Sequence, residues 1–154
     1  MEISIVTKKA FQAVGLPWKG TYAQAGAGEL RHVLADLKQR YADIAHNAQP
    51  DVILGISDEH HEEGFSYLFG ALVQEISELP DGMVSRTYPA QTYVSAHVQK
   101  GTNSGQAHGD LLNWIEENGY QHKQDVFTYL GLYSVHSDPF DSDPELTIMI
   151  PIHN

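Results

Sequence analysis

The sequence predicts an α+β fold in which a strand–helix–strand–strand unit occurs twice. The main observation is that strand-like alternation and helix-like spacing of apolar side chains follow one another in the same order in both halves. A second observation is a recurring segment, because Trp18-Lys-Gly-Thr21 returns as Gln99-Lys-Gly-Thr102, 81 residues later. Each copy precedes a predicted helix. The strand Leu54-Gly-Ile-Ser57 is likewise echoed by Leu130-Gly-Leu-Tyr-Ser134.

These repeats predict one domain over residues 1–154, with pseudo-repeats at about 1–78 and 79–154. One domain also suits the length of the chain. A helix that covers three strands buries only one face of them. Two such units can join their sheets, which places both helices on one side and leaves an open face on the other.

The helices are predicted from apolar side chains at steps of three and four residues. The first, over about 28–46, carries Leu30, Val33, Leu34, Leu37, Tyr41 and Ile44 on one stripe. The second carries Ala107, Leu111, Trp114 and Ile115, and Gly119 follows where a C-terminal cap is expected. The expected strands, in order, are 3–6 with 11–16, 52–56, 65–76, 83–89, 92–98, 126–135 and 146–152. Glycines and a proline between 15 and 28 predict a loop there.

An aromatic row on the strand 126–135 is the main functional signal. Alternation places Phe127, Tyr129, Gly131 and Tyr133 on one face, which we assign to the open side of the sheet. A glycine among bulky rings removes side-chain volume and is expected to leave the floor of a recess open. Aromatic walls with a few polar tips are typical of a small-molecule pocket.

Neighbouring strands add further candidates to this face. Met149 in the closing strand, and Tyr93 and His97 in the strand 92–98, point the same way by alternation. Tyr67 is placed there in the same manner, and Trp114 is expected to reach the rim from its helix. The alternative is that these strand aromatics only pack the sheet, with the glycine marking a bulge.

Composition excludes several classes of function. The 154 residues contain 9 Lys and Arg against 20 Asp and Glu, a net charge of -11. Such a surface opposes contact with nucleic acid and with anionic membranes. Cysteine is absent, which excludes disulfides and thiolate chemistry, and no apolar run is long enough to span a membrane. We therefore expect a cytoplasmic protein with no DNA-binding unit.

Two acidic segments are candidates for metal sites. In the segment 58–63 the histidines are adjacent, so they cannot share a helix face as zinc hydrolases require. Asp138, Asp141 and Asp143 lack the spacing and the closing glutamate of a calcium loop. Neither histidine–serine nor phosphate-binding motifs stand out. We expect no catalytic residues, no metal and no cofactor.

The chain resembles the GyrI-like effector-binding family, the domain also found in multidrug-sensing and AraC-type transcription regulators. The landmarks, in order, are Phe65-Ser-Tyr-Leu-Phe-Gly70, Leu79-Pro-Asp-Gly-Met83, Tyr88-Pro-Ala-Gln-Thr-Tyr93, the Trp114 helix ending near Gly119-Tyr120, and Ile148-Met-Ile-Pro-Ile152. The resemblance implies a curved antiparallel sheet with two helices on its back. It also implies a groove on the other face for bulky, hydrophobic and often cationic aromatic compounds.

In many members of that family a buried glutamate, two residues before a tyrosine, recognises positive charge. That tyrosine corresponds to Tyr133, and the glutamate position is Gly131 here. Cation–π attraction to the groove rings remains as a weaker source of preference for cations.

The leading hypothesis is a stand-alone binding protein that senses or sequesters a hydrophobic aromatic compound, in some cases for a regulatory protein partner. One alternative is a hydrolase of reactive hydrophobic toxins. Another is a protein-interaction factor that resembles gyrase inhibitors, in which acidic charge faces a basic partner.

Overall fold

The computed structural model describes residues 1–138 and 144–153. Its elements, in order, are β1 (Ile3–Lys8), β2 (Phe11–Thr21), α1 (Tyr22–Gly26), α2 (Glu29–Arg40), a 3-10 turn (Tyr41–Asp43), β3 (Val52–Asp58), β4 (Gly64–Val73), β5 (Val84–Tyr88), β6 (Gln91–Val98), α3 (Ser104–Glu117), β7 (Gln121–His122), β8 (Tyr129–Ser134) and β9 (Leu146–His153). This element order confirms the α+β prediction.

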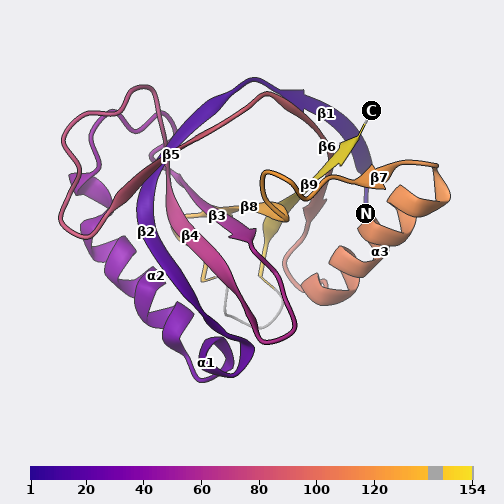
Figure 1. The fold of residues 1–154 in the computed structure, drawn as a ribbon, viewed down its shortest axis with the longest axis horizontal. Coiled ribbons are helices and arrows are strands. Elements are labelled where there is room, and N and C mark those ends of the chain that lie inside the picture. Colours follow the sequence, from indigo (N-terminus) through magenta and orange to yellow (C-terminus); the bar gives the residue numbers. More distant parts are fainter. Residues whose placement is uncertain (139–143, 154) are drawn as a thin grey trace.

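All paired strands of the sheet are antiparallel, in the order β1-β6-β9-β8-β3-β4-β2-β5, with β7 pairing to β9. This order is symmetrical about the central β3–β8 pair. On one side of it lie the strands of β2-α2-β3-β4, and on the other those of β6-α3-β8-β9. Figure 1 shows the sheet as a strongly curved layer that is not closed into a barrel. The division into two pseudo-repeats stays a prediction.

Both long helices cover the same face of the sheet, as predicted. Leu34 and Leu37 of α2 belong to one buried cluster together with Leu111 and Ile115 of α3. Helix α2 lies against β2 and β4, whereas α3 lies against β6 and β9. The central strands β3 and β8 therefore lie between the helices, which flank them in Figure 1.

Local capping explains where the helices begin and end. The Asn103 side chain accepts a hydrogen bond from the backbone N–H of Gln106 (2.9 Å) and begins α3. After α3, Gly119 takes the left-handed backbone conformation expected of a C-terminal cap (φ 79°). Helix α2 ends at Arg40, earlier than the predicted 28–46, and the chain continues as the 3-10 turn.

The opposite face of the sheet is not bare, contrary to the prediction. A second buried cluster covers it, formed by Phe11, Ala13, Leu54, Ile56, Leu68, Tyr88, Tyr93, Phe127, Leu130 and Met149. The curvature of the sheet brings these side chains together on its concave side, because distant strands bend toward one another. The sheet thus has an apolar core on each face.

Two strand predictions need correction. The predicted loop between 15 and 28 consists of the end of strand β2 and the short helix α1, and Gly15 lets the backbone of β4 approach closely at Gly70. Pro17 is tolerated because it lies beyond the last residue of β2 that pairs with β5. In the other case, the predicted strand 126–135 starts only at Tyr129.

None of the helices in the described ranges, 1–138 and 144–153, is long and apolar enough to cross a membrane.

Candidate functional site

The strip of sheet that lies between α2 and α3 (Figure 1), which we call the groove, has two glycines at its centre. Gly55 of β3 and Gly131 of β8 are directly paired, on the face that the helices cover. The ring of Tyr133 lies over both glycines. A Cβ atom on Gly55 would lie 3.1 Å from Cε2 of Tyr133, and one on Gly131 would lie 3.0 Å from its hydroxyl oxygen. The Tyr67 hydroxyl also lies against Gly55. The floor is therefore covered by tyrosine rings, and the predicted open floor at Gly131 is wrong.

The hydroxyl groups of Tyr67, Tyr129 and Tyr133 form a buried cluster above this floor. Tyr67 is hydrogen-bonded to both of the other tyrosines, and Tyr129 also to Ser57. The register explains the grouping, because Ser57 is paired with Tyr67 on one side and with Tyr129 on the other. Burial raises the pKa of each tyrosine, and the neighbouring hydroxyls raise that of Tyr67 further. For Tyr133, Tyr129 raises the pKa further, whereas the hydrogen bond with Tyr67 acts to lower it. All three are thus neutral groups at physiological pH.

A chain of hydrogen bonds links this cluster to the surface. Ser57 Oγ lies 2.6 Å from Nε2 of His60, and Nδ1 of His60 lies 2.9 Å from the hydroxyl of Tyr22. Burial lowers the pKa of His60, although the carboxylate of Asp58 acts in the opposite direction. A neutral imidazole both donates and accepts, so His60 can relay hydrogen bonds between Ser57 and Tyr22.

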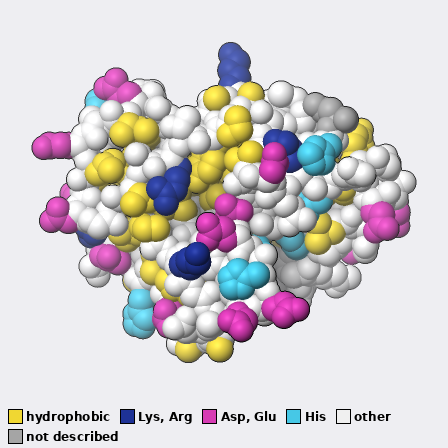
Figure 2. Space-filling model, in the orientation of Figure 1, with side chains coloured by type: hydrophobic (Ala, Val, Ile, Leu, Met, Phe, Trp, Pro, Cys, Tyr) yellow, Lys and Arg dark blue, Asp and Glu magenta, His cyan; other side chains and the backbone are white. Residues whose placement is uncertain are grey.

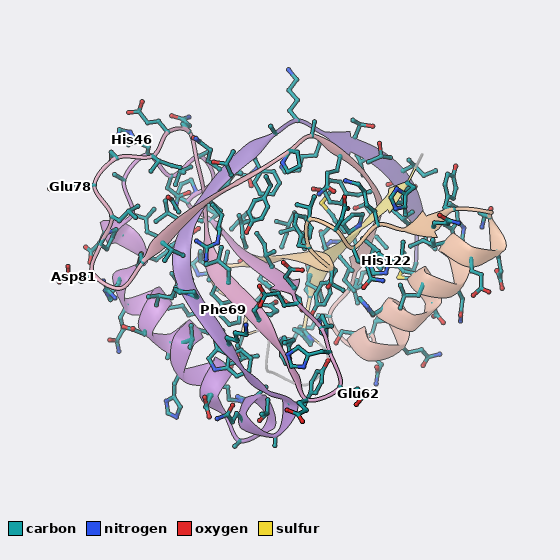
Figure 3. The ribbon with its side chains drawn as sticks, viewed as in Figure 1. His46, Glu62, Phe69, Glu78, Asp81 and His122 are labelled. Carbon is teal, nitrogen blue, oxygen red and sulfur yellow. The ribbon has the colours of Figure 1, made fainter. Side chains whose placement is uncertain are left out.

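Aromatic rings continue the groove along its α1 side. The ring of His60 is stacked on Phe65, at 5.1 Å between centroids and 4° between planes, and Tyr22 is stacked on Phe65 at 5.2 Å. Trp18 meets the edge of Phe65 at 5.1 Å. The adjacent Phe69, labelled at the middle of β4 in Figure 3, lies 4.6 Å from the ring of Tyr67. This wall offers ring faces to a planar apolar ligand.

A cavity of about 250 Å³ lies on the α3 side of the groove. Its lining consists of Ser104, Gly105, His108, Tyr129, Tyr133, Leu146 and Ile148. The imidazole of His108 meets the ring of Tyr129 at 4.9 Å. Burial lowers the pKa of His108, with His122 and His60 lowering it further. The cavity thus combines an apolar floor with neutral hydrogen-bonding groups, the composition of a small-molecule site.

The structure brings together four of the predicted site residues, on a different face from the one expected. Tyr67, Tyr129, Gly131 and Tyr133 all lie on the helix side of the sheet. Trp114 packs against the same cluster from α3, where it stacks on Tyr120 at 6.0 Å.

The other predicted site residues lie apart from the groove. Phe127, Tyr93 and Met149 are buried in the cluster on the opposite face. Phe127 precedes β8, and the chain bends between it and Tyr129, so the two-residue alternation does not extend to it. His97 is exposed, with its Nε2 3.2 Å from a carboxylate oxygen of Glu145.

Sequence reasoning missed Gly55, Ser57, His60 and His108. The echo between Leu54-Gly and Leu130-Gly was a usable signal for Gly55, since it places a glycine at the same position of both predicted repeats. His60 was considered only as a metal ligand, and both of its ring nitrogens are engaged by Ser57 and Tyr22. Within residues 1–138 and 144–153 no three acidic or histidine side chains are grouped to hold a metal. Asp141 and Asp143 lie outside the described residues.

Comparison with known proteins gives consistent results. The profile of the family described as GyrI-like small molecule binding domain matches residues 1–153. The transcriptional regulator BrlR of Pseudomonas aeruginosa is 31% identical over 159 residues, which span 99% of this chain and 56% of that protein. This chain therefore matches only about half the length of that regulator.

Among solved structures, SAV2435 bound to tetraphenylphosphonium is similar with a TM-score of 0.74 and 16% identity, over 100% of this chain and 95% of that one. The C-terminal domain of EcmrR has a TM-score of 0.70 and 12% identity, over 99% and 98% of the two chains.

Proposed function

Because the chain belongs to the GyrI-like small-molecule binding domain family, we propose that it binds hydrophobic aromatic compounds in the groove between α2 and α3. The biological role that we assign to this binding is sensing or sequestration of such compounds. The observation that carries the proposal is the tyrosine cluster over the Gly55–Gly131 pair, next to the 250 Å³ cavity.

The physical argument rests on the mixture of ring faces and hydroxyls. A ligand ring that displaces or stacks on Tyr133 gains apolar burial, and its polar atom finds a partner among hydroxyls that already bond to one another. Such a site avoids unpaired polar groups whether it is empty or occupied. Cavities of this size, extended by a side-chain rotation, suit compounds of two or three rings.

The charges around the site give little preference for cations over neutral compounds. Position 131 is a glycine, and the groups that contact the central floor are neutral tyrosines. The β3–β4 hairpin that carries His60 also carries Glu59, Glu62 and Glu63, with Glu62 at the tip in Figure 3. Charges at an exposed hairpin are screened by salt and attract cations only weakly. We therefore expect neutral aromatic compounds and monocations to bind with similar affinity, although the structural neighbour SAV2435 was solved with a cation.

The test is calorimetric titration with two matched compounds, the cation methyltriphenylphosphonium and the neutral triphenylphosphine oxide. We expect saturable binding of both, weakened in Tyr129→Ala and unchanged in His97→Ala, which alters an exposed residue outside the groove. Absence of binding to either compound, or equal weakening by both variants, would contradict the proposal.

A further inference from the structure

A second cavity lies on the opposite side of the sheet, and the proposed function does not use it. It has a volume of about 420 Å³, and its floor includes Ile56, Leu68 and Tyr88, all members of the second apolar cluster. Trp18 and Tyr67, which belong to the helix side, border it at one edge. Figure 2 shows hydrophobic side chains exposed over the region of β2 and β4, with basic and acidic side chains beside them.

Four charged side chains border this cavity, two of each sign. Lys19 and Glu59 neutralise each other, since Nζ of Lys19 lies 3.2 Å from a carboxylate oxygen of Glu59. Asp58 and Arg86 form no ion pair with any residue in the described part of the chain. Instead, Nη1 of Arg86 donates to the carbonyl of its neighbour Ser85 (3.1 Å).

Asp58 and Arg86 act on the same group, the hydroxyl of Tyr88. Burial raises the pKa of Tyr88 to about 12, while Arg86 acts to lower it and Asp58 acts to raise it. Burial also raises the pKa of Asp58 itself, although a backbone hydrogen bond at Glu59 and the nearby His60 act to lower it. The cavity therefore has an apolar floor, a phenol, and opposite charges that are not paired with each other.

We propose that this cavity binds a small zwitterion with an aromatic or aliphatic body, of the amino-acid type. Its ammonium group faces Asp58, its carboxylate faces Arg86, and its body packs on Ile56, Leu68 and the ring of Tyr88. A guanidinium and a carboxylate on one cavity select a ligand that carries both charges, because each ligand charge gains a charge-assisted hydrogen bond. A ligand with one charge leaves the other protein charge uncompensated.

Three indoles of nearly equal size test the proposal by calorimetry. They are L-tryptophan, which has both charges, tryptamine, which has only the ammonium, and indole-3-propionate, which has only the carboxylate. We expect tryptophan to bind at least tenfold more tightly than either of the others. Asp58→Asn should weaken the binding of tryptophan and of tryptamine about tenfold, which is the scale of one charged hydrogen bond. The affinity for indole-3-propionate should not change. Arg86→Gln should weaken the binding of tryptophan and of indole-3-propionate, and the affinity for tryptamine should not change.

Two controls separate this cavity from the groove. Lys100→Gln removes an exposed charge on the turn before α3 and should leave all three titrations unchanged. His108→Ala alters the 250 Å³ cavity of the groove but does not border this cavity, so tryptophan affinity should persist. Amide chemical-shift changes with tryptophan should centre on Asp58 and Arg86. Three results would overturn the proposal: no binding of tryptophan at 10 mM (a concentration of about this order being the limit for a weak site), equal affinity for the three indoles, or loss of tryptophan binding in His108→Ala.

Discussion

Gly55 and Gly131 face each other across the central strand pair β3–β8, and the ring of Tyr133 lies over both of them. They occupy the same position in the two predicted repeats, so the centre of the sheet lacks side chains on its helix side. A tyrosine from the floor itself fills that space. The arrangement explains why tyrosine rings occupy the centre of the groove.

Gly131→Glu should shift ligand preference toward cations. The new Cβ would lie 3.0 Å from the Tyr133 hydroxyl oxygen and 3.1 Å from Cε2 of its ring, so that ring must shift to accommodate the new side chain. A partly desolvated carboxylate at this position should favour methyltriphenylphosphonium over triphenylphosphine oxide by about 1–3 kcal/mol. The measurement is the ratio of the two dissociation constants. The neutral isostere Gly131→Gln serves as control, and an equal ratio in both variants would show that position 131 does not face the ligand.

Tyr133→Ala should open a ring-shaped cavity over the two glycines. Removal of a buried aromatic ring costs about 3–5 kcal/mol of unfolding free energy, and Tyr133 is 8% exposed. Added p-cresol should restore part of this loss by occupying the vacated space. Thermal melting with and without p-cresol measures both effects, with wild type as reference. Equal stabilisation of wild type and variant would mean that p-cresol binds elsewhere.

Gly109→Ala should stabilise the protein, whereas Gly28→Ala should not. An added Cβ meets no atom within 4 Å at either position, but Gly28 has a positive φ of 103° and Gly109 lies inside α3. Alanine in a helix interior is favoured over glycine by about 0.5–1 kcal/mol, while alanine at positive φ is strained. Denaturant unfolding of the two variants should therefore give changes of opposite sign. A gain in both would argue against the left-handed conformation at Gly28.

The free energy of unfolding should fall as the pH drops below the pKa of an ordinary histidine. Burial lowers the pKa of His60 and His108 in the folded protein, so the unfolded chain binds more protons than the folded chain in this range. Unfolding free energy therefore rises with pH between the lowered folded pKa and the unfolded value of about 6.5. The double variant His60→Asn/His108→Asn should have a shallower slope than wild type between pH 5 and 7, by urea unfolding (the range is set by that value of about 6.5). Parallel slopes would show that neither imidazole is held neutral by the fold.

The sequence by itself determined most of the element types, the order of the main strands and the two long helices, and the face that both helices share. Leu30, Leu34 and Leu37 form a helical stripe, and Ile148 and Ile150 alternate in a strand, because these are local periodicities that the backbone geometry imposes. The shared face of Tyr129, Gly131 and Tyr133 follows from the same two-residue period.

Only the tertiary structure decided that Tyr129, Gly131 and Tyr133 lie on the face that the helices cover. Alternation shows that Leu130 and Tyr133 point opposite ways, but both have buried environments here, since each face of the curved sheet carries its own apolar cluster. Nothing in the local pattern distinguishes a helix-covered face from one closed by curvature. The bend that separates Phe127 from Tyr129, and the meeting of Ser57, His60 and Tyr129, depend in the same way on strand pairing between residues far apart in the chain. Long-range register is set by the whole sheet, which is why the groove could be assigned to its residues only in three dimensions.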